Sequence, residues 1–469
     1  MATPAVTSIS TGSGSGTPNA KVHQPPPRRY PVARSKSRIP CVQFLSPGRG
    51  TSISKGGSSP RPTKRILVYF VPGNPGLAGY YTPFLETLRG LLDASCPRSQ
   101  SGGAGEGEAQ VEFDLYAQNL LGFDDSDHQV PFGTRIPGSE NGDGNGQKQE
   151  SLPFSLEDQI CGVWDSLGEI VKSGLEDAGT AGGVEPETNG DEDNGERQTK
   201  PKRYYYDQVI LMGHSVGAYI GMEIFHRHHH QLLALSHQQT DPDPDPENHQ
   251  KEVKFPFNLL AGIMLFPTIW DIAKSPNGLV FNRFIRNNAF MSNNAHKIAK
   301  WTVDWFPSWV LKSVVRNVMG FSDDGAETTT NFLTSRDGIH QALYLARDEM
   351  ASITEEKWER EMWEASHDLE QDESSKVGAE GKTKLKQGGD RFFFLFGKKD
   401  HWVADKTRDA FIEKRRQEHG DKGRVRVLVD ETGGVGGEKA GIPHAFCIHH
   451  SEVVAEKVKT WIDEVVASL

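Results

Sequence analysis

The sequence predicts an α/β protein with a mostly parallel central sheet and helices on both of its faces. Short apolar segments alternate with amphipathic helical segments from residue 65 to the C-terminus, as in a parallel sheet covered on both sides. Two of these segments, RILVYFVP at 65–72 and NLLAGIMLFP at 258–267, are almost continuously apolar. Strands with this composition are typical of a sheet that is buried on both faces.

The elements follow one another in a regular order. Strands are expected at 65–72, 111–117, 207–212, 258–267, 391–396 and 424–429. Helices are expected at 79–95, 155–175 and 451–467, and a further helix begins near Ser215. In the first helix, apolar residues recur at helical spacing, which predicts one buried face. The composition therefore predicts one large folded domain over residues 64–469, with a cap insertion at about 278–353.

Polar tracts flank and interrupt this domain. Residues 1–63 are rich in Ser, Pro, Gly and basic residues and contain no Asp or Glu, which predicts a disordered basic arm. A mitochondrial presequence and a contact with an anionic surface are the alternatives for this arm. Five further tracts, near 102–108, 137–150, 178–202, 237–251 and 371–389, are expected to be disordered surface insertions.

Several classes of protein are disfavoured by the composition. The four cysteines lack CxxC spacing, so we expect neither disulfides nor a metal site. Consecutive imidazoles at 226–230 cannot all face one ion and are expected to be a solvated helix end. The longest apolar run, at 259–270, is too short to span a membrane. The basic arm lacks the interleaved aromatic residues of a nucleic-acid surface, and no sequence feature calls for a cofactor.

A nucleophile motif, G-x-S-x-G, lies at Gly213, His214, Ser215, Val216 and Gly217. It directly follows the strand at 207–212 and opens an amphipathic helical run, which is the strand–turn–helix setting that the motif requires. The two glycines allow the tight turn that exposes the serine hydroxyl. This context predicts an α/β-hydrolase fold with Ser215 as the nucleophile.

A serine nucleophile needs a base and an orienting acid, which follow it in this chain order in the α/β-hydrolase fold. His444 is the best-placed base, because it follows the last strand and precedes the final helix, whereas His449 and His450 fall at the helix start. Asp400 follows the strand at 391–396 and is the favoured acid. Asp271, after the strand at 258–267, is its competitor.

The loop after the first strand, PGNPG at 72–76, is expected to supply part of an oxyanion hole. Its glycines permit close approach to a substrate, and its prolines restrict the backbone. Asn74 is the candidate donor in this loop, because both of the prolines around it lack an N–H group. The backbone N–H of Val216 is the second candidate donor.

With these residues in place, the chain resembles the lipid droplet-associated hydrolases. The matching segments are VPGNPGLAGYYTPFL, GHSVGAYIGMEI, FPTIWDIAKSPNG, GKKDHWV and PHAFCIHHSEVVA. The resemblance implies an α/β-hydrolase with Ser215, Asp400 and His444 as its triad, and it weakens the case for Asp271. It also implies association with the lipid droplet surface and a role in neutral lipid or sterol ester handling. The basic arm, the insertions and the loop after residue 117 depart from the family pattern.

The cap insertion carries large apolar residues and flanking basic residues, including Trp301, Trp305, Trp309, Lys300 and Lys312. This mixture is typical of a segment that lies in a lipid interface, and the alternative is a cap whose aromatic residues pack against the core.

The function predicted from the sequence is hydrolysis of carboxylic esters of hydrophobic lipids through an acyl-enzyme. The expected location is the lipid droplet surface and otherwise the cytosol, and an association with the endoplasmic reticulum is compatible with it. No obligate protein partner is expected. Two alternatives remain at this point: a droplet surface protein with vestigial catalysis, and a soluble thioesterase or peptidase that uses the same triad.

Overall fold

The computed structural model describes residues 41–44, 63–95, 110–128, 130–134, 150–180, 205–206, 208–238, 258–358, 362–363, 391–419, 424–431 and 441–469. All of them belong to one compact unit, which spans residues 33–469. The insertions expected near 102–108 and 371–389 lie outside the described residues, as do most of the other three and most of the arm at 1–63.

Seven strands form one sheet in the order β1-β3-β2-β4-β5-β6-β7. The strands are β1 (Cys41–Phe44), β2 (Thr63–Val71), β3 (Gln110–Gln118), β4 (Gln208–His214), β5 (Asn258–Leu265), β6 (Arg391–Gly397) and β7 (Val425–Asp430). Every neighbouring pair from β3 to β7 is parallel, and only β1 runs antiparallel to its neighbour β3. The predicted mostly parallel sheet is therefore confirmed.

Strand β1 corrects the prediction of a fully disordered arm. Residues 41–44 pair with β3 from Cys41 opposite Gln118 to Phe44 opposite Leu115. Val42 and Phe44 pack against the core while the two residues between and before them face outward, which is the alternation of an edge strand. Four residues in a polar context form too short a pattern for this strand to be predicted from the sequence.

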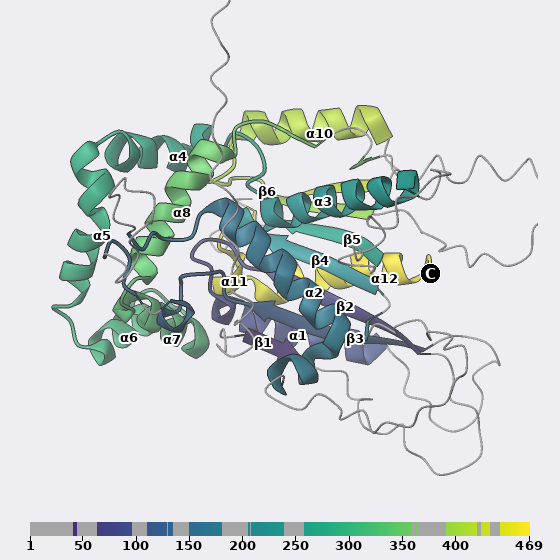
Figure 1. Ribbon diagram of the computed structural model, residues 1–469, viewed down its shortest axis with the longest axis horizontal. Coiled ribbons are helices and arrows are strands. Elements are labelled where there is room, and N and C mark those ends of the chain that lie inside the picture. The colour runs from purple at the N-terminus through teal and green to yellow at the C-terminus, as the bar shows by residue number, and fades with distance from the viewer. Residues whose placement is uncertain are drawn as a thin grey trace, which may run out of the picture. The chain divides into compact units, whose positions relative to one another are not determined.

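Helices cover both faces of the sheet (Figure 1). They are α1 (Thr82–Ser95), α2 (Leu156–Thr180), α3 (Val216–Gln238), α10 (Asp405–His419), α11 (Phe446–His449) and α12 (Ser451–Val466), with the short turns η2 (Ala78–Tyr81) and η3 (Asp125–Asp127). One buried cluster joins α2, α3 and α10 to the sheet, and a second joins α1, α11 and α12 to its other side. Helices α2 and α3 extend slightly into the segments that were expected to be insertions at 178–202 and 237–251.

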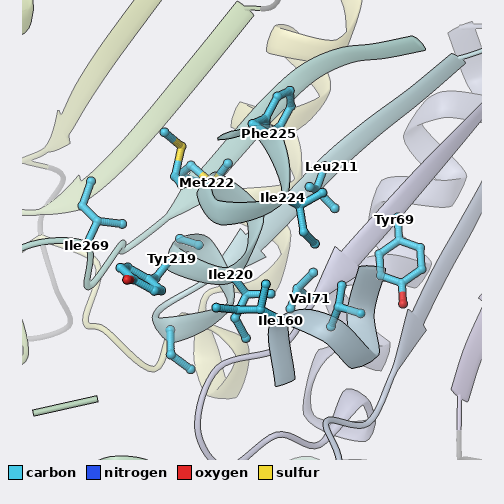
Figure 2. Packing of buried hydrophobic residues seen from close by; sticks show 14 of the residues in the cluster. Tyr69, Val71, Ile160, Leu211, Tyr219, Ile220, Met222, Ile224, Phe225 and Ile269 are labelled. Carbon is cyan, nitrogen blue, oxygen red and sulfur yellow. The ribbon is translucent and has the colours of Figure 1, made fainter. Parts of the chain in front are cut away.

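The nucleophile helix α3 lies at the centre of the first cluster. Figure 2 shows Tyr219 and Ile220 of α3 beside Ile160 of α2, with Val71 and Leu211 of the sheet close to them. All five side chains are at most 3% exposed. Burial on this scale stabilises a fold by about 1.5–3 kcal/mol for each large apolar side chain. Helix α3 is thereby held firmly behind the residue that precedes it, Ser215.

Between β5 and β6 the chain forms a group of helices that we call the cap: α4 (Pro276–Phe281), η6 (Asn282–Arg286), α5 (Ala289–Val303), α6 (Ser308–Asn317), α7 (Asp323–Thr334) and α8 (Gly338–Ser352). They follow a short turn, η5 (Ile272–Lys274), and gather at one end of the sheet (Figure 1). The cap begins at Ser275, whose Oγ accepts a hydrogen bond of 3.0 Å from the Gly278 N–H, and Pro276 occupies the first helical position.

Large apolar side chains are exposed on the first half of the cap. We call this group the apolar face: Leu279, Val280, Phe284, Phe290, Ile298, Trp301, Trp305, Phe306, Trp309, Val314, Val318 and Met319. Trp305 is 69% exposed and Trp309 is 74% exposed, so these indoles do not pack into the core. Among the residues that the structure describes, no helix is long and apolar enough to cross a membrane.

Candidate active site

Ser215 lies on the sharp turn between β4 and α3. Its backbone adopts a left-handed conformation, with φ of 55°, which non-glycine residues rarely occupy. A Cβ atom at Gly217 would lie 2.2 Å from the Val71 carbonyl oxygen, and one at Gly213 would lie 2.2 Å from the Gly217 oxygen. Both glycines of the motif are therefore required by close backbone packing. This turn places the serine hydroxyl at the carboxyl edge of the sheet.

The structure brings His444 to Ser215. The imidazole Nε2 lies 2.9 Å from Ser215 Oγ, and Nδ1 lies 2.8 Å from Asp400 Oδ2. The loop that carries His444 follows β7, and its Ile442 N–H donates to the buried carboxylate of Asp430 at 2.9 Å. Strand β7 thus anchors the loop two residues before the histidine.

Asp400 follows β6 and is 5% exposed. Its Oδ1 accepts a hydrogen bond of 2.8 Å from the Trp402 N–H, which leaves Oδ2 directed at His444. The competitor Asp271 instead pairs with Lys274 at 2.7 Å. The structure therefore places Asp400, and not Asp271, in contact with the imidazole.

These contacts define what the three side chains can do. A carboxylate only accepts hydrogen bonds, so Asp400 fixes the imidazole proton on Nδ1 and leaves Nε2 to accept the proton of Ser215. Ser215 is 9% exposed, so this proton transfer would take place in surroundings that are largely shielded from water. An arrangement of this kind can activate a serine as a nucleophile.

A second hydrogen-bonded chain, which we call the relay, runs beside the triad. The Gly73 N–H donates to the Tyr81 hydroxyl oxygen at 3.1 Å, and that hydroxyl lies 2.7 Å from His214 Nδ1. His214 Nε2 lies 2.9 Å from the carbonyl oxygen of His444. Because a carbonyl only accepts, Nε2 of His214 donates and its Nδ1 accepts from Tyr81. The relay joins the loop after β2 to the backbone of His444.

Burial keeps both members of the relay neutral. Desolvation and, second, the charge on a protonated His444 hold the pKa of His214 well below its usual range. Desolvation and, second, Cys447 raise the pKa of Tyr81 well above its usual range. His214 belongs to the nucleophile motif predicted from the sequence. Tyr81 could not be predicted, because this tyrosine lies in a helical segment with no local sign of a polar role.

The loop PGNPG lies against the nucleophile. A Cβ atom at Gly73 would lie 2.9 Å from Ser215 Cβ, so only glycine fits there without displacement. In the described part of the chain, the backbone N–H groups of Asn74 and Val216 have no protein acceptor, whereas that of Gly73 donates to Tyr81. Asn74 and Val216 therefore remain the candidate oxyanion donors.

The side chain of Asn74 is held by the cap. Its Nδ2 donates to the Ala342 carbonyl and to Glu349 Oε1, both at 3.0 Å, and both acceptors lie on α8. Burial raises the pKa of Glu349 to about 8, the bond from Asn74 opposes this effect, and the charge of Asp348 adds to it. The unfolded carboxyl titrates near 4.5, so its stabilising contribution is complete below that pH and is lost as the pH rises through about 8. Sequence reasoning missed Glu349 because it stands in a charged segment that reads as exposed.

No group of three or more His, Cys, Asp or Glu side chains suited to a metal ion occurs among the described residues.

The chain has a mostly parallel sheet with a strained serine between a strand and a helix. An aspartate and a histidine follow this serine in the chain and lie at the same edge of the sheet. These features define an α/β-hydrolase. The family model for lipid-droplet associated hydrolases matches residues 64–181 and 196–447, so the chain belongs to this family. The chain is 22% identical to the lipid droplet-associated hydrolase of Gallus gallus over 90% of this chain and 91% of that protein. It is 20% identical to the lipid droplet-associated hydrolase of Mus musculus, over 85% of this chain and 84% of that protein.

Among solved structures, the chain is similar to the epoxide hydrolase VrEH1 from Vigna radiata, with 12% identity and a TM-score of 0.38 over 86% of this chain and 93% of that chain. It is also similar to the peroxisomal alpha-beta-hydrolase Lpx1 from Saccharomyces cerevisiae, with 11% identity and a TM-score of 0.38 over 87% of this chain and 79% of that chain.

Proposed function

We propose that the protein hydrolyses carboxylic esters of hydrophobic lipids, of the sterol ester or acylglycerol type, at the surface of lipid droplets. The observation that carries this proposal is the continuous contact from Ser215 through His444 to Asp400, at 2.9 and 2.8 Å. Ser215 attacks the ester carbonyl while His444 takes its proton, and Asp400 orients the imidazole and stabilises its charged form. The N–H groups of Asn74 and Val216 stabilise the oxyanion.

The same three residues account for every proton transfer of this reaction. Loss of the alcohol takes the proton back from His444 and leaves an acyl group on Ser215. Water, deprotonated by the same imidazole, then releases the carboxylic acid and restores the serine. No metal or cofactor takes part in these steps.

The apolar face of the cap supports the proposed location. Residues 276–320 contain six Lys or Arg and one Asp, in a chain whose net charge is -11. Basic residues beside exposed Trp and Phe suit a segment whose apolar side chains enter a lipid monolayer. We therefore propose that the apolar face contacts the droplet surface.

The assignment of the nucleophile is tested with a fluorophosphonate probe, which labels activated serines. We expect labelling of the wild type and its loss in both Ser215→Ala and His444→Ala, with unfolding transitions that stay close to the wild type for Ser215→Ala. Equal labelling of Ser215→Ala would refute the assignment. Once labelling is established, turnover of sterol esters and of acylglycerols identifies the substrate class.

The proposed location is tested separately. Trp305→Ser combined with Trp309→Ser removes two indoles that are 69% and 74% exposed, so folding should be unaffected. Each fully buried large apolar side chain contributes about 1.5–3 kcal/mol to transfer from water, so partition onto lipid emulsions should fall by roughly tenfold or more. Labelling by the soluble probe should not change. Unaltered partition would contradict the role of the apolar face.

The same face favours a second candidate function, that of a droplet surface protein whose triad is vestigial. Binding through the apolar face does not depend on Ser215, so the two functions separate in cells. Droplet effects that persist in Ser215→Ala favour the surface protein, and effects that disappear favour the hydrolase.

A further inference from the structure

A cleft of about 320 Å³ lies between η6 and α8 of the cap. Its lining is formed by Arg286, Tyr344, Arg347, Asp348 and Ala351. The four lining residues from α8 recur at spacings of three and four, so they form one stripe along that helix. On the other side of the same helix, Glu349 is buried against the loop after β2, so this cleft is separate from the candidate active site.

The charges in this cleft are unbalanced. Among the described residues, no carboxylate lies within 4.0 Å of the guanidinium of Arg286 or of Arg347, and the Arg347 Nη1 donates to the Ser292 carbonyl at 3.3 Å. Asp348 lines the cleft, but its Oδ2 accepts the Leu156 N–H at 2.6 Å and its Oδ1 accepts the Ser352 hydroxyl at 3.2 Å. Two positively charged side chains therefore line a cleft in which the one lining carboxylate, that of Asp348, already accepts hydrogen bonds from the protein.

A smaller cavity adjoins the cleft, with Tyr344 and Arg347 common to both. It is also lined by His296 and His340, whose rings stack with centroids 3.7 Å apart. Burial first and then the neighbouring imidazole lower the pKa of His340 to about 4. Burial first and then the charge of Lys297 also lower the pKa of His296, so at neutral pH both imidazoles are uncharged and the two guanidinium groups carry the positive charge of the site.

Guanidinium groups bind phosphate oxygens in pairs of parallel hydrogen bonds, and two of them in one cleft suit a phosphate group better than a single carboxylate. The surroundings indicate the source of the phosphate. Phe284, two residues before Arg286, is 58% exposed and belongs to the apolar face. Arg286 is also exposed and belongs to the same helical turn, so a monolayer whose acyl layer receives Phe284 would bring headgroups within reach of this turn.

We propose that the cleft between Arg286 and Arg347 binds the phosphate of a phospholipid headgroup and thereby orients the cap on the lipid surface. The proposal rests on the proposed docking of the apolar face. It goes beyond general attraction between a basic cap and an anionic surface, because it assigns recognition of the phosphate to two arginines. The other unpaired arginine of the same segment, Arg283, does not line the cleft and provides a matched control.

The test measures binding of the full-length protein to triacylglycerol emulsions with two coatings, phosphatidylcholine and a galactolipid that carries no phosphate. The variants are Arg286→Gln with Arg347→Gln, each singly and together, and Arg283→Gln. Charge-assisted contacts are lost in the double variant, so its affinity for the phosphatidylcholine coating should fall by about tenfold to a hundredfold. Arg283→Gln should lower affinity by no more than roughly fivefold, as expected for one basic residue near a surface. On the galactolipid coating, Arg286→Gln and Arg283→Gln should behave alike.

Three results would overturn the proposal. The first is an equal loss of affinity for phosphatidylcholine in Arg283→Gln and Arg286→Gln, and the second is an equal loss of affinity for both coatings in the double variant. The third is binding of inorganic phosphate, measured by calorimetry, that depends on Arg286 while the protein shows no preference between the two coatings. The last result would assign the cleft to a free phosphate. Labelling of Ser215 by the fluorophosphonate probe is measured on every variant, because it reports folding and distinguishes failure of this proposal from failure of the proposed catalytic function.

Discussion

Removal of one hydroxyl group, in Tyr81→Phe, tests whether the relay positions the candidate base. That hydroxyl accepts from the Gly73 N–H at 3.1 Å and lies 2.7 Å from His214 Nδ1, and Tyr81 is 3% exposed. The variant leaves both partners buried and unpaired, at a cost of about 1–3 kcal/mol each. We therefore expect the free energy of unfolding to fall by roughly 2–6 kcal/mol.

We expect Tyr81→Phe to affect the reactivity of Ser215 less than it affects stability, and the two effects can be measured separately. Without Tyr81, His214 keeps its contact with the His444 carbonyl but loses the partner that fixes its tautomer and ring orientation. One positioning hydrogen bond contributes about 0.5–1.5 kcal/mol, which corresponds to a decrease of roughly twofold to tenfold in the rate of fluorophosphonate labelling. The rate is measured well below the unfolding transition, so that loss of folded protein does not contribute.

Tyr80→Phe is the matched control, because the Tyr80 hydroxyl bonds to Thr329 of the cap at 3.0 Å and takes no part in the hydrogen bonds of the relay. We expect its labelling rate to equal that of the wild type. A double-mutant cycle with His214→Gln then separates positioning from general destabilisation. If Tyr81 acts through His214, its replacement should have little further effect on labelling once His214 has been changed. Additive losses in the double variant, or wild-type labelling of Tyr81→Phe, would refute the reasoning.

Two further predictions concern the loop after β2 and its contact with the cap. Gly73→Ala places a Cβ atom 2.9 Å from Ser215 Cβ, so labelling should fall by about tenfold or more, whereas Gly90→Ala, where the new Cβ meets nothing within 4 Å, should label normally. Equal labelling of these two variants would contradict the close packing at the nucleophile. Glu349→Gln retains an acceptor for the oxyanion loop but cannot ionise, so it should match the wild type near pH 4.5 and become the more stable protein as the pH approaches 8. The difference in the free energy of unfolding should grow by about 1.4 kcal/mol per pH unit in this interval, and parallel urea-unfolding curves at all pH values would exclude a raised pKa.

The strands of the sheet could be predicted from the sequence because their pattern is local. The apolar run before PGNPG ends at Val71, and the run before the serine turn ends at His214, each within two residues of the expected boundary. Strand β1 could not be predicted because its place in the sheet depends on pairing with β3, whose partner residues lie 71 to 77 positions further along the chain, from Phe44 opposite Leu115 to Cys41 opposite Gln118. Such a contact leaves almost no signal in a four-residue segment.

Some residues of the candidate site could likewise be predicted from the sequence, and others could not. Ser215, Asp400 and His444 each follow a strand, and the carboxyl ends of parallel strands meet at one edge, so their proximity could be expected. Tyr81 and Glu349 come from helical segments that reach this edge only through tertiary packing. In isolation, a tyrosine on an apolar helix face predicts a core residue, and a glutamate in a charged segment predicts exposure. Their roles become visible only from their hydrogen-bond partners.

The loop after β2 links the cap to the nucleophile. Asn74 donates to Ala342 and Glu349 of α8, so this later helix of the cap holds the loop through polar contacts. The apolar face, in contrast, lies on the first half of the cap and has no such contact with the loop. A lipid surface that displaced α8 would have to break these bonds and would disturb a candidate oxyanion donor. Docking through the first half of the cap is therefore compatible with an intact site, because the helices that meet lipid are not the ones that hold Asn74.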